Sequence, residues 1–236
     1  MLMSLGKVFI PVALPLLFAA IASAGVVTVG GSGSENGFPF GNSSYSGRYQ
    51  AEYVLPDVGA IDIHSISFSI AGGSGGTQTV SIGLAVGSNP VGSMAANYLS
   101  NAGAGYESIF SGSLTVPSSG SLVVPVSTGY QFNANGNNPL LLDIDVTGPY
   151  SGSTEFVAGA DPNTERVSNL YGYSTPFRDD ITLQMQVDYS VTATPEPASA
   201  SFVVTGLLAL AALNRRRISG LLRRSDRRGP CANRTA

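Results

Sequence analysis

The alternation of apolar and polar residues near the carboxyl end is the feature that most constrains the fold. Between residues 181 and 191 every second side chain is apolar, and the intervening ones are Thr, Gln, Asp or Ser. A period of two is that of a β-strand with one buried face. We predict one strand here, with its core side made of Ile181, Leu183, Met185, Val187, Tyr189 and Val191.

The same period recurs through most of the preceding chain. Residues 140–146 place alternate apolar side chains on one face, with Asp143 and Asp145 on the other. Further strands are predicted at 26–29, 48–55, 106–116, 121–126, 154–158 and 167–173. About eight to ten short strands with Gly, Pro and Asn turns indicate an all-β fold, and we predict an antiparallel β-sandwich or jelly-roll-like domain over residues 25–193.

Two glycine-containing segments carry specific local predictions. Gly-Gly-Ser-Gly-Gly at 72–76 lies between alternating runs at 61–70 and 80–86, which predicts a β-hairpin with the glycines as its turn. In the first run His64, Ile66 and Phe68 would share a face. Upstream, a loop over 30–46 contains Phe-Pro-Phe-Gly at 38–41, and we expect it to dock two aromatic rings on the domain.

The first 24 residues have the pattern of a secretory signal peptide. Lys7 precedes an apolar run from 8 to 21, and Ala22, Ser23 and Ala24 form a small-x-small cleavage site. We predict cleavage between Ala24 and Gly25, by way of the Sec translocon and signal peptidase. The alternative is an uncleaved membrane anchor.

A three-part pattern occupies residues 194–217. Pro195, Glu196 and Pro197 come first and predict a short extended segment, because proline fixes φ and lacks an N–H. The apolar run 198–213 predicts a single transmembrane helix, short for a bilayer core of about 30 Å. Arg215, Arg216 and Arg217 follow and would hold that end in the cytoplasm. The alternative is a buried hairpin of a globular domain.

This order resembles the PEP-CTERM sorting signal of Gram-negative bacteria, which is a Pro-Glu-Pro box, a transmembrane helix and an Arg cluster. The resemblance implies processing by an exosortase at the inner membrane, an association with exopolysaccharide and biofilm, and a final location on the cell surface or in the extracellular matrix. Such signals usually stop soon after the arginines, whereas here a basic tail, 218–236, follows and is expected to stay in the cytoplasm.

Charge divides the chain in the same way. Residues 25–197 hold 14 acidic and 3 basic side chains, a balance of −11, whereas residues 198–236 hold 8 arginines and Asp226, a balance of +7. An acidic exported domain argues against a nucleic-acid partner, which would require a basic face. It suits an exported protein or one that takes up divalent cations.

Few residues point to catalysis. His64 is the single histidine, so a triad would need it with Asp57 or Asp62, and no nucleophile elbow is present. The one cysteine, Cys231, lies in the basic tail, so no internal disulfide can form. We therefore expect no enzymatic activity, no required cofactor and no transition-metal site.

Two kinds of ligand stay open. Calcium is the candidate for the carboxylates of Asp143, Asp145, Asp179 and Asp180. Sugars could stack on the tyrosines at 45, 49, 53, 171 and 173, although core positions are the commoner place for tyrosine. The sequence thus predicts a non-enzymatic envelope or matrix protein, with a secreted glycan-binding module or glycan hydrolase as the alternative.

Overall fold

The computed structural model describes residues 23–41, 47–169, 175–192, 206–207 and 210–211. By its contacts the chain divides into two units, Ile21–Ala193 and the two terminal segments taken together. The predicted signal peptide up to Ala22, the sorting signal except four of its residues, and the tail 218–236 lie outside the described residues. Within the described ranges no helix is both long and apolar enough to cross a membrane.

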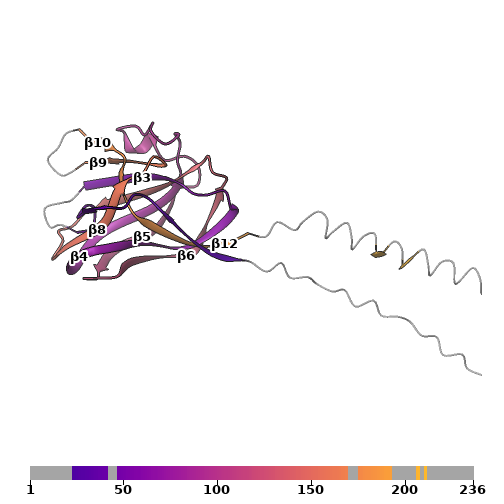
Figure 1. Ribbon diagram of the computed structural model, residues 1–236, viewed down its shortest axis with the longest axis horizontal. Coiled ribbons are helices and arrows are strands. Elements are labelled where there is room, and N and C mark those ends of the chain that lie inside the picture. Colours follow the sequence, from indigo (N-terminus) through magenta and orange to yellow (C-terminus); the bar gives the residue numbers. More distant parts are fainter. Residues whose placement is uncertain (1–22, 42–46, 170–174, 193–205, 208–209, 212–236) are drawn as a thin grey trace, which may run out of the picture. The chain divides into compact units, whose positions relative to one another are not determined.

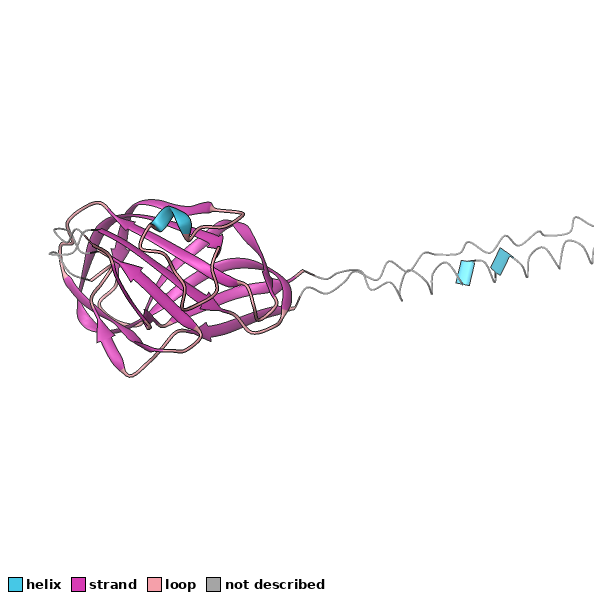
Figure 2. Cartoon of the chain, turned by 90° about the horizontal axis from the view of Figure 1, so that it is seen from above, coloured by secondary structure: helices cyan, strands magenta, loops and turns pink. Residues whose placement is uncertain are grey.

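The described part of Ile21–Ala193 is built almost entirely from strands (Figure 2), and every strand pairing is antiparallel. The all-β prediction is therefore confirmed. One 3-10 turn, η1 (Tyr98–Ser100), is the exception. The strands are β1 (Ala24–Val29), β2 (Ser34–Asn36), β3 (Gly47–Val54), β4 (Gly59–Val86), β5 (Glu107–Val116), β6 (Ser121–Ala134), β7 (Pro139–Val146), β8 (Ser153–Ala160), β9 (Thr164–Ser168), β10 (Phe177–Asp179), β11 (Ile181–Leu183) and β12 (Met185–Val191).

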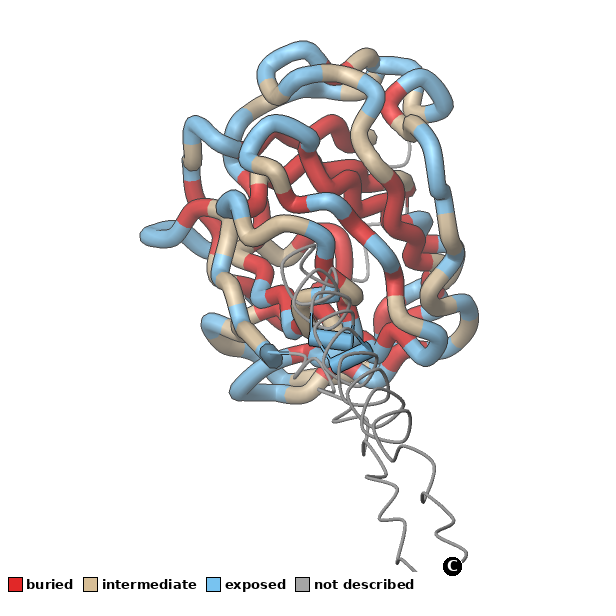
Figure 3. The backbone as a smooth tube through the Cα atoms, turned by 90° about the vertical axis from the view of Figure 1, so that its right-hand side faces the viewer, coloured by how far each residue is buried: buried red, intermediate tan, exposed pale blue. Residues whose placement is uncertain are grey.

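Two larger groups of strands share a common core, and β8, which pairs with β2, β11 and the middle of β4, adds to it. The first sheet has the order β1–β12–β4–β6 and uses the first part of β4. The second has the order β5–β4–β7–β3–β9–β10 and uses the last part of β4. Ile66 and Val187 from the first sheet and Ile82 and Leu142 from the second belong to one buried apolar cluster. Figure 3 shows buried backbone gathered inside the domain, with exposed segments around it.

The predicted hairpin at the glycine-rich segment is wrong. Residues 59–86 form one strand of 28 residues, β4, which runs from the first sheet through the glycines into the second (Figure 1). The segment stays extended because β8 pairs with it, and bulges between Ile70 and Gly72 and between Gly73 and Gly75 bend it. Bulges are the usual device by which a strand turns a corner between sheets.

The predicted strand over residues 181–191 is two strands. It breaks at Gln184, whose N–H donates to the Val157 carbonyl over 2.9 Å, so that β11 pairs with β8 while β12 pairs with β1 and β4. The apolar side chains from Leu183 to Tyr189 are buried as predicted, but Ile181 is 37% exposed. The change of partner strand at Gln184 reorients the chain, and Thr182 takes a buried place instead.

The aromatic loop docks as predicted. Phe38 and Phe40 are both buried, although only β2 and the residues up to Gly41 are described in this loop. The Phe40 ring lies 5.4 Å from that of Phe68 and 5.6 Å from that of Phe156, measured between centroids. The tilted rings close one side of the core in the geometry that aromatic pairs prefer.

Candidate functional site

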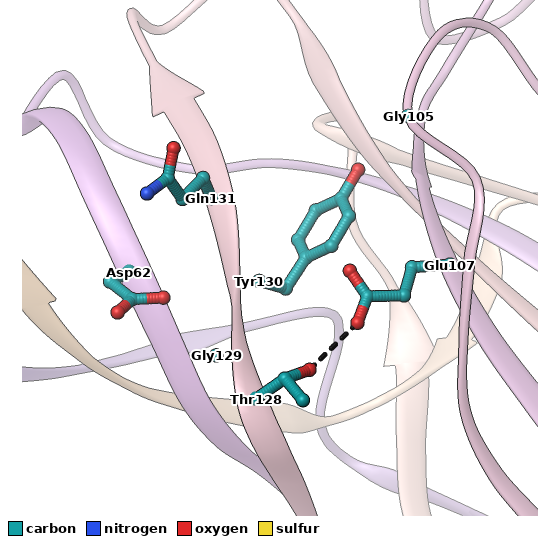
Figure 4. A pocket seen from close by; sticks show the side chains of 7 residues that line it. All are labelled: Asp62, Gly105, Glu107, Thr128, Gly129, Tyr130 and Gln131. Atoms are coloured by element: carbon teal, nitrogen blue, oxygen red, sulfur yellow. Dashed lines mark hydrogen bonds between the residues drawn. The ribbon is translucent and has the colours of Figure 1, made fainter.

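A polar pocket of about 530 Å³ opens where β4, β5 and β6 meet (Figure 4). This volume lies in the range of small-ligand sites. β4 contributes Asp62, β5 contributes Glu107, and Gly105 comes from the segment before β5. The remaining lining residues are consecutive in β6: Thr128, Gly129, Tyr130 and Gln131.

A break in the β4–β6 ladder builds this pocket. Ile63 pairs with Tyr130, and Ser65 pairs with Pro125. Between these two pairs β4 has one residue, His64, whereas β6 has the four residues 126–129. The extra residues leave the ladder, and the Thr128 hydroxyl reaches β5, where it donates to Glu107 Oε1 over 2.8 Å. Such bulges re-aim side chains and occur often beside binding sites.

Gly129 keeps the pocket open between its two halves. Its φ is 72°, in the left-handed region that favours glycine, and a Cβ there would lie 2.3 Å from Asp62 Oδ1. In Figure 4, Glu107 and Tyr130 lie on one side of β6, and Asp62 and Gln131 lie on the other. A ligand in this pocket would therefore cross over the bare backbone of Gly129.

Tyr130 presents a hydroxyl to the pocket from a side chain that is otherwise buried, with 3% exposure. Burial, and then the negative charge of Glu107, raise the pKa of Tyr130 to about 12, so the phenol stays protonated at neutral pH. Within the described chain, this hydroxyl has no hydrogen-bond partner. It is free to donate to, or accept from, a ligand.

The pocket has no basic lining residue, and no unpaired arginine lies elsewhere in the described domain. Its three arginines form ion pairs: Arg48 with Asp143 over 2.6 Å, Arg166 with Asp179 over 2.6 Å, and Arg178 with Glu165. The described ranges contain 13 acidic side chains, so 13 − 3 leaves 10 without an arginine partner. An anionic ligand would meet no unpaired cation here.

A second polar site is buried under the loop 87–105, on the outer face of the second sheet. Glu52 of β3 is fully buried, and neither carboxyl oxygen has a hydrogen-bond partner among the described residues. Glu165 stands directly opposite on β9 and is bound by Arg178 and by the Met94 N–H, the latter over 2.8 Å. Burial, reinforced by the charge of Glu165, raises the pKa of Glu52 from 4.5 to about 8.

The four calcium candidates are not brought together. Asp143 accepts two hydrogen bonds from Arg48, over 2.8 and 2.6 Å, and Asp145 is exposed on the same strand, β7. Asp179 of β10 accepts from Arg166 and is separated from β7 by two strands, β3 and β9, while Asp180 is exposed. Over the described ranges, no group of three or more His, Cys, Asp or Glu could hold a metal ion.

His64 does not share a face with Ile66 and Phe68. It occupies the β4 side of the bulge, so its side chain is exposed, and Nε2 lies 2.8 Å from the Ser190 hydroxyl. No carboxylate of the described residues hydrogen-bonds the other ring nitrogen, so neither Asp57 nor Asp62 completes a triad with this pair.

The sugar-stacking prediction is wrong for the two tyrosines that the structure describes. Tyr49 and Tyr53 are fully buried, and the Tyr53 hydroxyl donates to the Leu183 carbonyl over 3.1 Å. Tyr45, Tyr171 and Tyr173 lie outside the described residues. So do Ala22, Pro195, Glu196, Pro197 and Arg215 to Arg217, whose predicted roles in cleavage, sorting and membrane stop are not located here.

Sequence reasoning missed the pocket itself. It ended a strand at Val126, whereas β6 continues to Ala134, and it considered Asp62 only as a partner for His64. The sequence signal that could have indicated the pocket is the run of small residues Ser127, Thr128 and Gly129, because such a run with a glycine favours an irregularity within a strand.

No family model matches the chain, and no match to it was found among the curated proteins or the solved structures.

Proposed function

We propose that this chain is an exported, non-enzymatic protein of the cell envelope or extracellular matrix, with a β-sandwich of jelly-roll type as its exported part. The Sec translocon and signal peptidase handle residues 1–24. Residues 198–213 hold the chain in the inner membrane, and an exosortase-like enzyme recognises Pro195 to Pro197 before release or transfer. The function is linked to exopolysaccharide and biofilm through the sorting signal that the chain resembles.

The observation that supports this proposal is the pairing of the first strand with the last. β1 begins at Ala24, the residue before the proposed cleavage bond, and Ala24 lies opposite Ser190 of β12. Cleavage there would remove Ser23 and Ala24, so β1 of the processed chain would begin at Gly25, which lies opposite Tyr189 of β12. The two proposed processing sites thus lie at the same end of one antiparallel strand pair, with only residues 193 and 194 between the described domain and Pro195.

This pairing also fits the order of events during export. The peptide bond between Ala24 and Gly25 lies within β1, where Gly25 packs so closely that a Cβ would be 2.7 Å from the Tyr189 ring. A protease that grips an extended chain needs this segment unpaired. Because β12 crosses the membrane last, signal peptidase has access until nearly the whole domain has been exported.

The test is to replace Pro195, Glu196 and Pro197 with alanine and to follow the full chain by fractionation and mass spectrometry in a host that contains an exosortase. We expect wild type to lose its carboxyl-terminal segment and the variant to keep it. Alanine at Pro117, Ser118 and Ser119, in the β5–β6 turn, is the matched control and should be processed as wild type. Equal masses of wild type and variant in the same membrane fraction would disprove the sorting step.

A second candidate function is glycan binding, and the pocket at the β6 bulge is the observation that favours it. Its walls are carboxylate, amide, hydroxyl and backbone groups, which are the usual partners of sugar hydroxyls. A glycan array probed with the full chain tests this candidate. Reproducible binding that Tyr130→Phe weakens would support it, and the absence of any specific binding would rule it out.

A further inference from the structure

We infer that the pocket at the β6 bulge binds a hydroxylated ligand through a primary ammonium group, as carried by a sugar with a free amine. This inference rests on the second candidate function, glycan binding, and names the chemical class of its ligand. Three features carry it: the charge of the lining, the unpartnered hydroxyl of Tyr130, and the opening over Gly129.

The charge of the lining selects the ligand. Asp62 and Glu107 are both half-buried carboxylates, and the seven lining residues include no cation. No ion pair joins either carboxylate to a described residue, and Glu107 uses one oxygen for Thr128 and leaves the other unused. A ligand with an ammonium group would gain charge-assisted hydrogen bonds, whereas a carboxylate or phosphate would be repelled.

Tyr130 supplies the second, independent feature. The side chain is only 3% exposed, and its hydroxyl has no hydrogen-bond partner among the described residues, so at the pocket this hydroxyl is left to water or a ligand. Because the pKa of the phenol is about 12, the group keeps its proton and can accept from an ammonium or donate to a sugar hydroxyl. Glu107 lies beside the Tyr130 ring in Figure 4, so both groups serve one end of the ligand.

The opening over Gly129 sets the size of the ligand. The pocket continues from Glu107 and Tyr130 past Gly129 to Asp62 and Gln131, and its volume is about 530 Å³. That span suits a ligand longer than one ammonium ion, with acceptors available at both ends. A sugar oligomer with free amines and a linear polyamine share this chemistry, and the experiment separates them.

The experiment titrates the full chain, in non-ionic detergent, with a glucosamine trimer, its fully N-acetylated counterpart, and spermidine by isothermal titration calorimetry. We expect saturable binding of one glucosamine trimer per chain, at least about tenfold tighter than the acetylated trimer. A ratio of this size corresponds to the loss of one charge-assisted hydrogen bond. Glu107→Gln should weaken binding about tenfold or more, and Tyr130→Phe, which keeps the buried ring, about threefold or more.

The control is Asp188→Asn, which removes an exposed carboxylate of the first sheet outside the pocket and should change affinity less than twofold. Thermal unfolding of each variant verifies that it is folded. Equal affinity for the two trimers would overturn the ammonium inference and leave glycan binding intact. Binding of spermidine alone would show that the pocket takes a polyamine and not an amino sugar, and binding of none of the three ligands would overturn the ammonium inference, while the glycan array remains the test of glycan binding. An equal loss in Asp188→Asn would show diffuse charge attraction and overturn the site.

Discussion

At the scale of single residues, the domain is marked by acidic groups in unequal surroundings. Asp143, Asp179 and Glu165 are each neutralised by an arginine, and each of these pairs is partly or largely buried. Glu52 has no such partner, and Glu165, opposite it, is of like charge. Carboxylates directly opposite across a ladder destabilise a sheet unless one of them is neutral.

Glu52 therefore predicts a specific pH dependence. Its pKa in the folded protein, about 8, lies above the value of 4.5 expected for the unfolded chain. Between these values the folded state holds a proton on Glu52 that the unfolded state lacks. The contribution of Glu52 to the free energy of unfolding is therefore fully present below pH 4.5 and is lost as the pH rises to about 8. In Glu52→Gln this fall should be absent, and at pH 9 its melting temperature should exceed that of wild type by roughly 2–10 °C, relative to their difference at pH 5.

Differential scanning calorimetry from pH 4 to pH 9 measures this effect. Asp188→Asn, in which an exposed carboxylate is removed, should keep the pH profile of wild type. If Glu52→Gln and wild type lose stability in parallel between pH 5 and pH 9, the buried carboxyl is not the group responsible.

At the scale of elements, β4 connects the two sheets of the domain. Its first part lies in the first sheet, its last part lies in the second, and its glycine-rich middle pairs with β8. Glycine is required at the middle because the backbones of β4 and β8 approach closely there. At Gly73 the φ is 133°, and a Cβ would lie 2.2 Å from the Ser153 carbonyl oxygen.

Adjacent glycines in this segment should differ sharply in their tolerance of substitution. Gly73→Ala introduces both backbone strain and a clash with backbone that cannot move aside, and we expect it to lower the free energy of unfolding by about 2–4 kcal/mol. Gly72→Ala meets no atom within 4 Å and should change it by less than about 0.5 kcal/mol. Urea denaturation of the two variants measures this difference. Similar losses of the free energy of unfolding in both would show that the close approach of β4 to β8 does not require glycine at position 73.

The β6 bulge allows a second paired comparison. Gly129→Ala and Gly120→Ala both place a side chain at positive φ, 72° and 82°, and each should cost about 1–2 kcal/mol. Only at Gly129 would the new Cβ press on the Asp62 carboxylate, since nothing lies within 4 Å of Gly120. We expect Gly129→Ala alone to weaken binding of the glucosamine trimer by at least about threefold in calorimetry. Equal affinities of the two variants would contradict the role given to Gly129.

At the scale of the whole molecule, one core serves both sheets. Buried side chains from β3, β4, β6, β7 and β12 belong to the same apolar cluster, and β4 belongs to both sheets. Neither sheet can therefore lose its packing without exposing the other. The three arginine ion pairs all lie on the second sheet, while the pocket lies where β6 of the first sheet meets β5 of the second.

We expect the fragment 23–192 to unfold in one cooperative step. The chain has no tryptophan and 10 tyrosines, so tyrosine fluorescence reports the core while far-ultraviolet circular dichroism reports the strands. Coincident urea transitions by the two probes would agree with a single shared core, as in most small domains. Separate midpoints would indicate that the sheets unfold independently.

The sequence by itself determined the β character of the domain, because alternation with period two is a local property of the sequence. It also placed Leu183 to Tyr189 and the alternate residues from Leu140 to Val146 in the core, and it predicted that the 38–41 segment would dock. The sequence did not indicate which strands pair with one another. A run of glycines permits a turn or a bent strand equally, and only pairing with β8, about 80 residues away, keeps β4 extended.

The candidate site was decided by tertiary structure alone. Asp62, Glu107 and Tyr130 come from three strands and meet because four residues of β6 face one of β4, a register that no local pattern specifies. Likewise Arg48 and Asp143, 95 positions apart, are joined by the register of β3 on β7, which removes Asp143 from the calcium candidates as a free ligand. Local periodicity sets which face of a strand is buried, whereas the contacts between strands set which polar groups meet.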